Sequence, residues 1–123
     1  MAAISEARHA GEFIMSEGNG HISREVVTVV SGAGALAAGT VLAKVTASGK
    51  YKASTATGSD GGQTAIAVLF APVDATSADV SAVVIARNAE INGNLLAYDS
   101  SVDDATKKAA KATQLAAVGI IVR

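Results

Sequence analysis

The sequence predicts a mainly β (α+β) fold, in which a small antiparallel β-rich domain carries one C-terminal helix and an extended N-terminal arm. Short runs of β-branched residues, separated by turn residues, follow one another from Glu25 to Ile91. One amphipathic helical pattern comes after them, near the C-terminus. The sequence lacks alternating strand–helix–strand units, and this disfavours a parallel doubly wound sheet.

The composition indicates one domain with a core of small side chains. The chain has 123 residues, half of them hydrophobic, but only two Phe, two Tyr and no Trp. Alanine is abundant and buries little apolar area, so a small domain built from Ala and Val has a thin margin of stability. We therefore expect this chain to gain stability from its own copies or from a larger assembly.

Charge and cysteine content disfavour several classes of partner. The net charge is −1 and no basic stripe is visible, so nucleic acid is not an expected partner. Without cysteine the chain has no disulfides and no thiolate chemistry. The N-terminus does not read as a signal peptide, and no run reaches the roughly 18 apolar residues of a membrane span. We expect a soluble chain with no membrane partner.

The first 24 residues differ from the rest and predict two parts, an arm at residues 1–24 and a β-rich body at residues 25–123. The arm contains both histidines and no persistent apolar period, so we expect it to be extended or disordered when alone. Its apolar patch Phe13-Ile14-Met15 has two interpretations. It is either a docking segment for a partner or a staple onto the body of the same chain.

The body is predicted to contain six strands and an irregular loop. The expected strands are 26–30, 40–47, 50–52, 64–70, 79–87 and 120–122, with 89–91 continuing the fifth past a bulge. Ser48-Gly49 predicts a hairpin turn, and Asn92-Gly93 predicts a turn. Thr64–Phe70 is apolar on both faces, so it is central or lies at a subunit contact. Thr57–Gly62 is a loop, and Lys44, Lys50 and Lys52 decorate the solvent face of the hairpin.

The helical pattern near the C-terminus has a cap, two faces and a stop. Ser101-x-x-Asp104 is the predicted cap, and Gly119 is placed to end the helix. The expected sheet-facing side is Ala105, Ala109, Ala112 and Ala116, and the expected solvent side is Asp103, Asp104, Lys107, Lys111 and Gln114. Ion pairs are predicted between Asp103 and Lys107 and between Asp104 and Lys108.

No motif in the chain predicts catalysis, a metal or a cofactor. Gly32–Ala37 matches G-x-G-x-x-A, but a strand follows instead of a helix, and no acidic residue lies about 20 residues further on. The glycines therefore predict a tight loop between strands. His9 and His21 lie in the arm and do not make a metal site alone. We expect no catalytic, metal-binding or cofactor-binding residues, and hence no enzyme.

Several ordered segments resemble the tailed-phage head decoration protein family, named for the lambda-type decoration protein. No single motif is specific, but order and spacing match together from Ile14 to Arg123. The segments that carry the resemblance are Ser23–Val27, Gly39–Val45, Asp60–Ala67, Asp74–Thr76 before Asp79–Val84, and Arg87–Asn92, followed by the lysine-bearing helix and Gly119–Arg123.

The resemblance implies a structural virion protein on the outside of the phage head, assembled in the host cytoplasm. Such proteins are homotrimers at three-fold and quasi-three-fold positions of an expanded capsid, where they cement neighbouring major capsid proteins against the pressure of packaged DNA. The N-terminal arm orders on the shell and adds a strand to capsid-protein segments, which is β-augmentation. The expected capsid-binding residues are Phe13, Ile14, Met15, Ile22, Ser23 and Arg24.

A second function class is a small β-fold module that binds a ligand or glycan in a loop such as Thr57–Gly62. That class would need aromatic residues for stacking or a polar pocket. Only Tyr51 and Tyr98 are available, so we rank this alternative below the capsid protein, and an enzyme below both.

Overall fold

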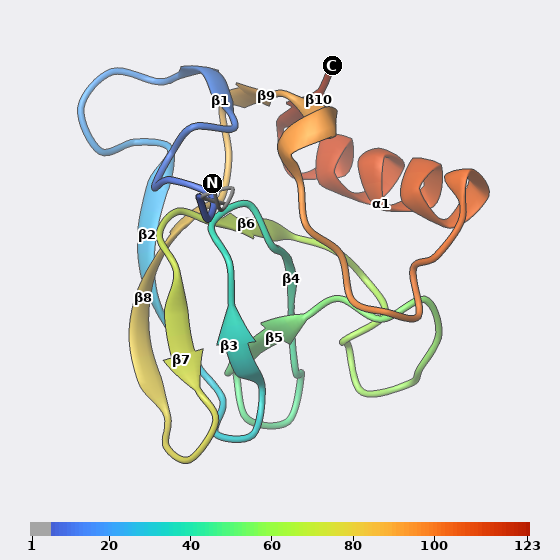
Figure 1. The fold of residues 1–123 in the computed structure, drawn as a ribbon. Coiled ribbons are helices and arrows are strands. Elements are labelled where there is room, and N and C mark those ends of the chain that lie inside the picture. Colours follow the sequence, from blue (N-terminus) through green and yellow to red (C-terminus); the bar gives the residue numbers. More distant parts are fainter. Residues whose placement is uncertain (1–5) are drawn as a thin grey trace, which may run out of the picture.

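The computed structural model describes residues 6–123, which form a closed five-stranded barrel with two smaller sheets and one helix (Figure 1). The barrel strands follow the order β2 (Arg24–Val29), β5 (Tyr51–Ala53), β4 (Val41–Lys44), β6 (Ala67–Leu69) and β8 (Val80–Ile85). All neighbours are antiparallel except β2 and β5, which are parallel. The predicted fold class, mainly β with one C-terminal helix, is confirmed.

A three-stranded sheet and a two-stranded sheet complete the β structure. The larger one has the order β1 (Ile14–Glu17), β9 (Ala89–Ile91), β10 (Ile120–Val122), with β10 parallel to β9. The smaller one pairs β3 (Gly34–Leu36) with β7 (Val73–Ala75). The helical elements are η1 (Gly93–Leu95), a 3-10 turn, and α1 (Ala105–Ala117).

The protein has two hydrophobic clusters, one inside the barrel and one on its outer wall. The inner cluster is made of Val29, Leu42, Tyr51, Ala67, Leu69, Ala75, Ala82 and Val84. The outer cluster is made of Phe13, Val41, Ala65, Val68, Ile85, Ala89, Ile91, Leu96, Leu115 and Ile120. The outer cluster therefore joins the barrel to the β1–β9–β10 sheet and to α1.

Most predicted strands are present, and the differences have local causes. The hairpin at Ser48-Gly49 is confirmed, since β4 and β5 pair antiparallel. Two short strands, β3 and β7, were missed because each has three residues and β3 begins at Gly34 with φ +88°. The segment 89–91 belongs to another sheet, because Asn88 at φ +50° redirects the chain. The predicted turn at Asn92-Gly93 is present and starts η1.

The predicted orientation of the C-terminal helix is wrong. Its buried residues are Lys111 and Leu115, whereas Ala105, Ala109 and Ala116 are exposed. The Lys111 ammonium donates to the carbonyls of Thr55 (2.6 Å) and Gln63 (2.7 Å). Gln114 likewise accepts the Ala65 backbone N–H at 2.8 Å. These long side chains bond loop backbone that methyl groups could not satisfy, so the polar residues turn inward.

The C-terminal end of α1 agrees with the sequence, whereas Asp104, and not Ser101 of the predicted pattern, is the capping residue, and only one of the two predicted ion pairs forms. Asp104 caps the helix by accepting the Lys107 N–H, and Gly119 ends it at φ +87°. The Asp103–Lys107 pair is confirmed at 2.8 Å. Lys108 instead places its ammonium 5.4 Å from the centre of the Tyr98 ring. No helix within residues 6–123 is long and apolar enough to span a membrane.

Candidate functional site

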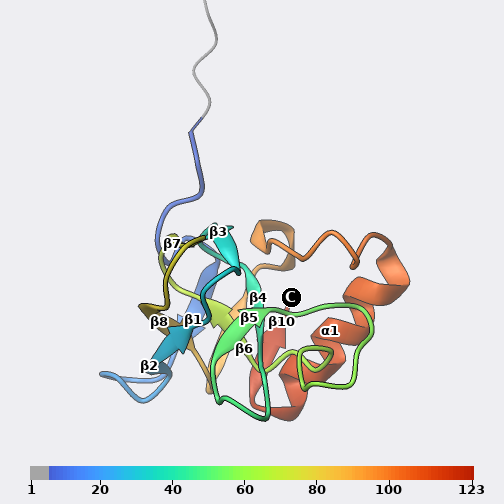
Figure 2. The same cartoon turned by 90° about the horizontal axis from the view of Figure 1, so that it is seen from below.

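The predicted arm does not stay apart from the body beyond residue 10. In Figure 2 the first described residues project from the barrel, and the chain that follows packs against it. Phe13 is fully buried in the outer cluster, and its carbonyl accepts the Asn92 N–H at 2.8 Å. Next, β1 pairs antiparallel with β9, so Ile14 lies opposite Ile91 and Glu17 opposite Ala89. Phe13 thus acts as the staple onto the same chain.

The loop after β1 is held by a buried serine. The Ser23 hydroxyl accepts the Gly18 N–H at 2.7 Å and donates to the Asn88 carbonyl at 2.9 Å. Gly18 is required by close packing, because a Cβ built there would lie 2.2 Å from a methyl carbon of Ile22. Ser23 is therefore a structural residue in this chain, with its side chain turned away from solvent.

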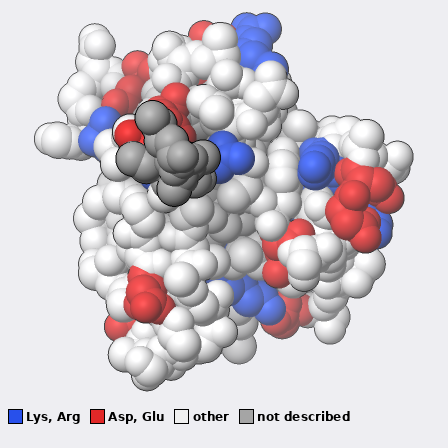
Figure 3. Space-filling model, viewed as in Figure 1, with Lys and Arg blue, Asp and Glu red and all other residues white. Residues whose placement is uncertain are grey.

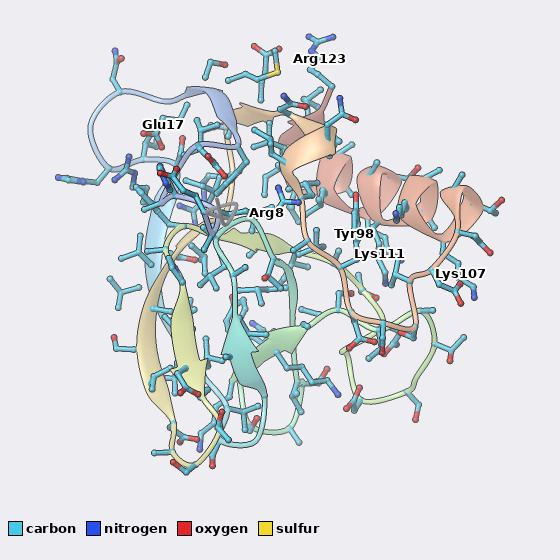
Figure 4. The ribbon with its side chains drawn as sticks, in the orientation of Figure 1. Arg8, Glu17, Tyr98, Lys107, Lys111 and Arg123 are labelled. Atoms are coloured by element: carbon cyan, nitrogen blue, oxygen red, sulfur yellow. The ribbon has the colours of Figure 1, made fainter. Side chains whose placement is uncertain are left out.

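Arg24 is also engaged within the chain. Its guanidinium donates two hydrogen bonds to the Glu17 carboxylate, at 2.7 and 3.2 Å, and lies 4.2 Å from the centre of the Phe70 ring. The hydrogen bond that Arg24 donates to Glu17 holds the pKa of Arg24 above its ordinary value. Glu17, labelled in Figure 4, comes from β1 and Arg24 starts β2, so this pair ties the first sheet to the barrel.

The structure separates the six predicted binding residues into three groups. Phe13 and Ser23 are fully buried, and Ile14 and Arg24 are half-buried. Met15 and Ile22 remain exposed, at 59% and 54%. Met15 stands out because the β1–β9 register shifts between Ile14 and Ser16. Met15 and Ile22 are thus the two predicted residues that offer large apolar surface to a partner.

A further surface residue, Ile121, was missed as a candidate. It is 40% exposed and lies opposite Glu90 of β9, which in turn lies opposite Ser16 of β1. A shallow hollow on this sheet is lined by Ser16, Glu17, Gly18, Asn88, Ala89, Glu90, Gly119 and Ile121. The alternation in Ile120–Val122 could have indicated one outward side chain, but not that β10 joins the strand formed by the N-terminal segment.

Glu90 connects both ends of the chain across this sheet. Its carboxylate accepts bonds from the Ser16 hydroxyl (2.9 Å) and the Arg123 guanidinium (2.8 Å). The Arg123 bond, helped by Ser16, lowers the pKa of Glu90 from its ordinary value of 4.5. The folded state therefore holds a charged Glu90 at a pH where the unfolded state already binds a proton.

Stability is expected to fall on acidification, in part through Glu90. A carboxyl whose pKa is lower in the folded state stabilises the fold above the unfolded pKa, and this contribution disappears as pH falls through the folded pKa. The Glu90→Gln variant should therefore show a shallower decline of the denaturation midpoint between about pH 6 and pH 3. Glu12→Gln is the control, because Glu12 forms no ion pair within residues 6–123. Parallel wild-type and Glu90→Gln profiles would contradict this role.

The Thr57–Gly62 loop uses its polar groups internally. Asp60 accepts from the Lys52 ammonium (2.8 Å) and from the Gly62 N–H (2.9 Å), and both bonds lower the pKa of its carboxyl. Tyr51 is buried in the barrel, and Tyr98 is half-buried beside Lys108. The loop therefore offers no aromatic side chain for stacking on a ligand.

The remaining side chains that could take part in chemistry do not gather into a site. The His9 imidazole lies 3.3 Å from the Glu6 carboxylate. Within residues 6–123, no three His, Cys, Asp or Glu side chains gather as metal ligands. On the face seen in Figure 3, acidic and basic side chains are interspersed without a field of one sign.

Comparison with known families decides the class of protein. The family model described as bacteriophage lambda head decoration protein D matches residues 3–120, nearly the whole chain. The chain belongs to this family. As a head decoration protein it has a structural role on the phage capsid, and its place in the virion is the head. The family is one of structural proteins, not of known enzymes. No curated protein matches the sequence.

Proposed function

We propose that this head decoration protein binds the outer surface of the expanded phage capsid as a homotrimer. It would occupy three-fold and quasi-three-fold positions and cement neighbouring major capsid proteins against the pressure of packaged DNA. Assembly would take place in the host cytoplasm, with no nucleic acid, membrane or cofactor taking part. The observation that carries the proposal is the match of the head decoration family to residues 3–120.

The surface around β1 supports contact with the capsid. Met15 and Ile22 present apolar side chains on a segment that Phe13, Ser23 and the Glu17–Arg24 pair hold in place. β1 is the edge strand of its sheet, bonded to β9 on one side. An extended capsid-protein segment could add to the other side through main-chain hydrogen bonds, which is β-augmentation. A fixed, exposed edge with apolar side chains suits this mode of binding.

The double variant Met15→Ser/Ile22→Ser is expected to bind expanded capsids at least about tenfold more weakly than the wild type, because two apolar side chains then lose their burial. Binding would be measured as occupancy of expanded shells that lack the decoration protein, over a range of protein concentrations. Since both residues are more than half exposed, the thermal midpoint of the isolated protein should change little.

Ala47→Ser, in the exposed turn between β4 and β5, is the matched control. Undiminished shell occupancy by the double variant would refute the β1 surface as the contact. A wild-type chain that never binds expanded shells would refute the proposed function itself. Deleting residues 1–22 is a poorer test, because it removes Phe13 from the core and unfolds the site with the segment.

A further inference from the structure

One wall of the barrel carries an apolar row that the described chain covers only in part. Phe70, Val83 and Val26 lie side by side across β6, β8 and β2, since the Phe70 N–H bonds the Val83 carbonyl and Val83 pairs with Val26. Their neighbours in the same strands, such as Val84, point into the barrel core. By strand alternation these three side chains share the outer face.

The rest of the chain covers these three side chains less and less from Phe70 through Val83 to Val26. Gly11 lies against the Phe70 ring, where an added Cβ would come within 3.1 Å, and the Arg24 guanidinium lies over the same ring. Val83 is 38% exposed and Val26 is 71% exposed, the largest value among the exposed large hydrophobic residues of the described chain. With His21, Arg24 and Glu25, the two valines line a shallow hollow. Within residues 6–123 the wall thus ends in a bare apolar patch, Val26 and Val83.

The backbone and the charges around the patch restrict what can bind it. β8 is paired on both sides at Val83, with Val26 of β2 and with Phe70, so a partner cannot add a strand to β8 there. β2 pairs with β5 only at Val29, so beside Val26 it is bonded on the β8 side alone. A partner seated over both valines contacts the side chains that share the outer face. The charged side chains at the rim already form ion pairs within the chain, Arg24 with Glu17 at 2.7 Å and Arg87 with Glu25 at 2.9 Å. The patch is accordingly suited to an apolar surface that brings no net charge.

We infer that the Val26–Val83 patch is the seat of a second copy of this chain. A copy carries a net charge of only −1, and it exposes the alanines Ala105, Ala109 and Ala116 along α1. In Figure 1, α1 lies on the opposite flank of the barrel from β2 and β8. Two unlike apolar surfaces on different sides of one chain are what a closed head-to-tail ring requires.

The area needed is consistent with a ring of small subunits. A standard contact buries about 800 Å² per partner, and each copy in a ring makes two contacts. That total is about a quarter of the 6553 Å² accessible surface of the chain. The inference rests on the trimer of the proposed function and adds which surface joins the copies.

The Val26→Asp variant tests the inference by its mass in solution. A carboxylate at the contact centre should raise the protein concentration needed for half assembly at least about tenfold. Sedimentation or light scattering should then report a mass falling toward the 12.2 kDa of one chain. Ala47→Asp, exposed in the β4–β5 turn, should assemble as the wild type does, and circular dichroism would show that both variants are folded.

A second measurement uses the absence of cysteine from the chain. In a Val26→Cys variant the thiol should be alkylated several-fold more slowly as protein concentration rises and the contact forms, while Ala47→Cys should react at a constant rate. Three results would each overturn the inference. The first is a Val26→Asp protein that keeps the wild-type mass, and the second is a wild type that is monomeric at every concentration. The third is a Val26→Cys thiol whose alkylation rate does not depend on protein concentration. Loss of shell binding with unchanged mass would also overturn it, because the patch would then face the capsid protein. Shell binding by the wild type, measured separately, decides the proposed function.

Discussion

Phe13→Ala is expected to lower the free energy of unfolding by about 3–5 kcal/mol, the usual cost of truncating a fully buried Phe. Phe13 has no exposed surface and packs with Ile85, Ile91 and Leu115 in the outer cluster. Its removal leaves a cavity where the barrel wall, the β1–β9–β10 sheet and α1 meet. Chemical denaturation of the full chain would measure the loss.

Such a loss is large compared with the roughly 5–15 kcal/mol of a typical domain. If Phe13→Ala does not fold at all, Phe13→Leu keeps most of the apolar volume and should give a smaller, measurable loss. Met15→Ala is the control in the neighbouring strand, and should change stability by less than about 0.5 kcal/mol because its side chain is 59% exposed. A Phe13→Ala protein as stable as Met15→Ala would contradict the staple and restore Phe13 as a docking residue.

Lys111→Met is expected to destabilise the protein by about 2–4 kcal/mol, since it leaves buried acceptors without donors. The side chain is 2% exposed, and its ammonium bonds the carbonyls of Thr55 and Gln63 at the two sides of the 57–62 loop. Figure 4 shows Lys111 reaching from α1 toward this loop. Burial lowers the pKa of Lys111, opposed by the charge of Asp99. Methionine keeps the apolar stem and removes only the ammonium group.

The effect should be concentrated in the loop that Lys111 holds. Amide hydrogen exchange at residues 54–66 should become faster in Lys111→Met than elsewhere in the barrel. Lys108→Met, one turn earlier on the exposed side of α1, loses only its contact with the Tyr98 ring and should cost below about 1 kcal/mol. Equal stability of Lys111→Met and Lys108→Met would show that the two carbonyl bonds contribute nothing net.

Local patterns in the sequence predicted most elements of the body. Val26–Val30 is rich in β-branched residues and became β2, and the turn at Ser48-Gly49 joins two strands that do pair. The Ser101-x-x-Asp104 pattern and the stop at Gly119 place α1 in the right part of the chain, although the capping residue is Asp104. These signals succeed because each depends on the conformational preferences of residues next to one another.

The errors concern features that local patterns do not determine. In α1, four alanines formed one apparent apolar face, but a methyl group supplies little burial, and the hydrogen bonds available to Lys111 and Gln114 decided which side turned inward. In the first segment, a four-residue strand with a bulge at Met15 shows no period. Nothing near Phe13 in the sequence indicates that Ile85 and Leu115 will surround it.

The sequence by itself determined the family, the mainly β class, the order of most strands and the presence of one C-terminal helix. Only the tertiary structure decided that the strands close into a barrel, that Phe13 and Ser23 lie inside while Met15 and Ile22 remain outside, and that Val26 stands bare beside Val83. The physical reason is that exposure and closure follow from pairings between segments far apart in the chain, such as β1 with β9 and β2 with β8. The hydrogen bonds and apolar contacts of those pairings have no counterpart in the pattern of a single segment.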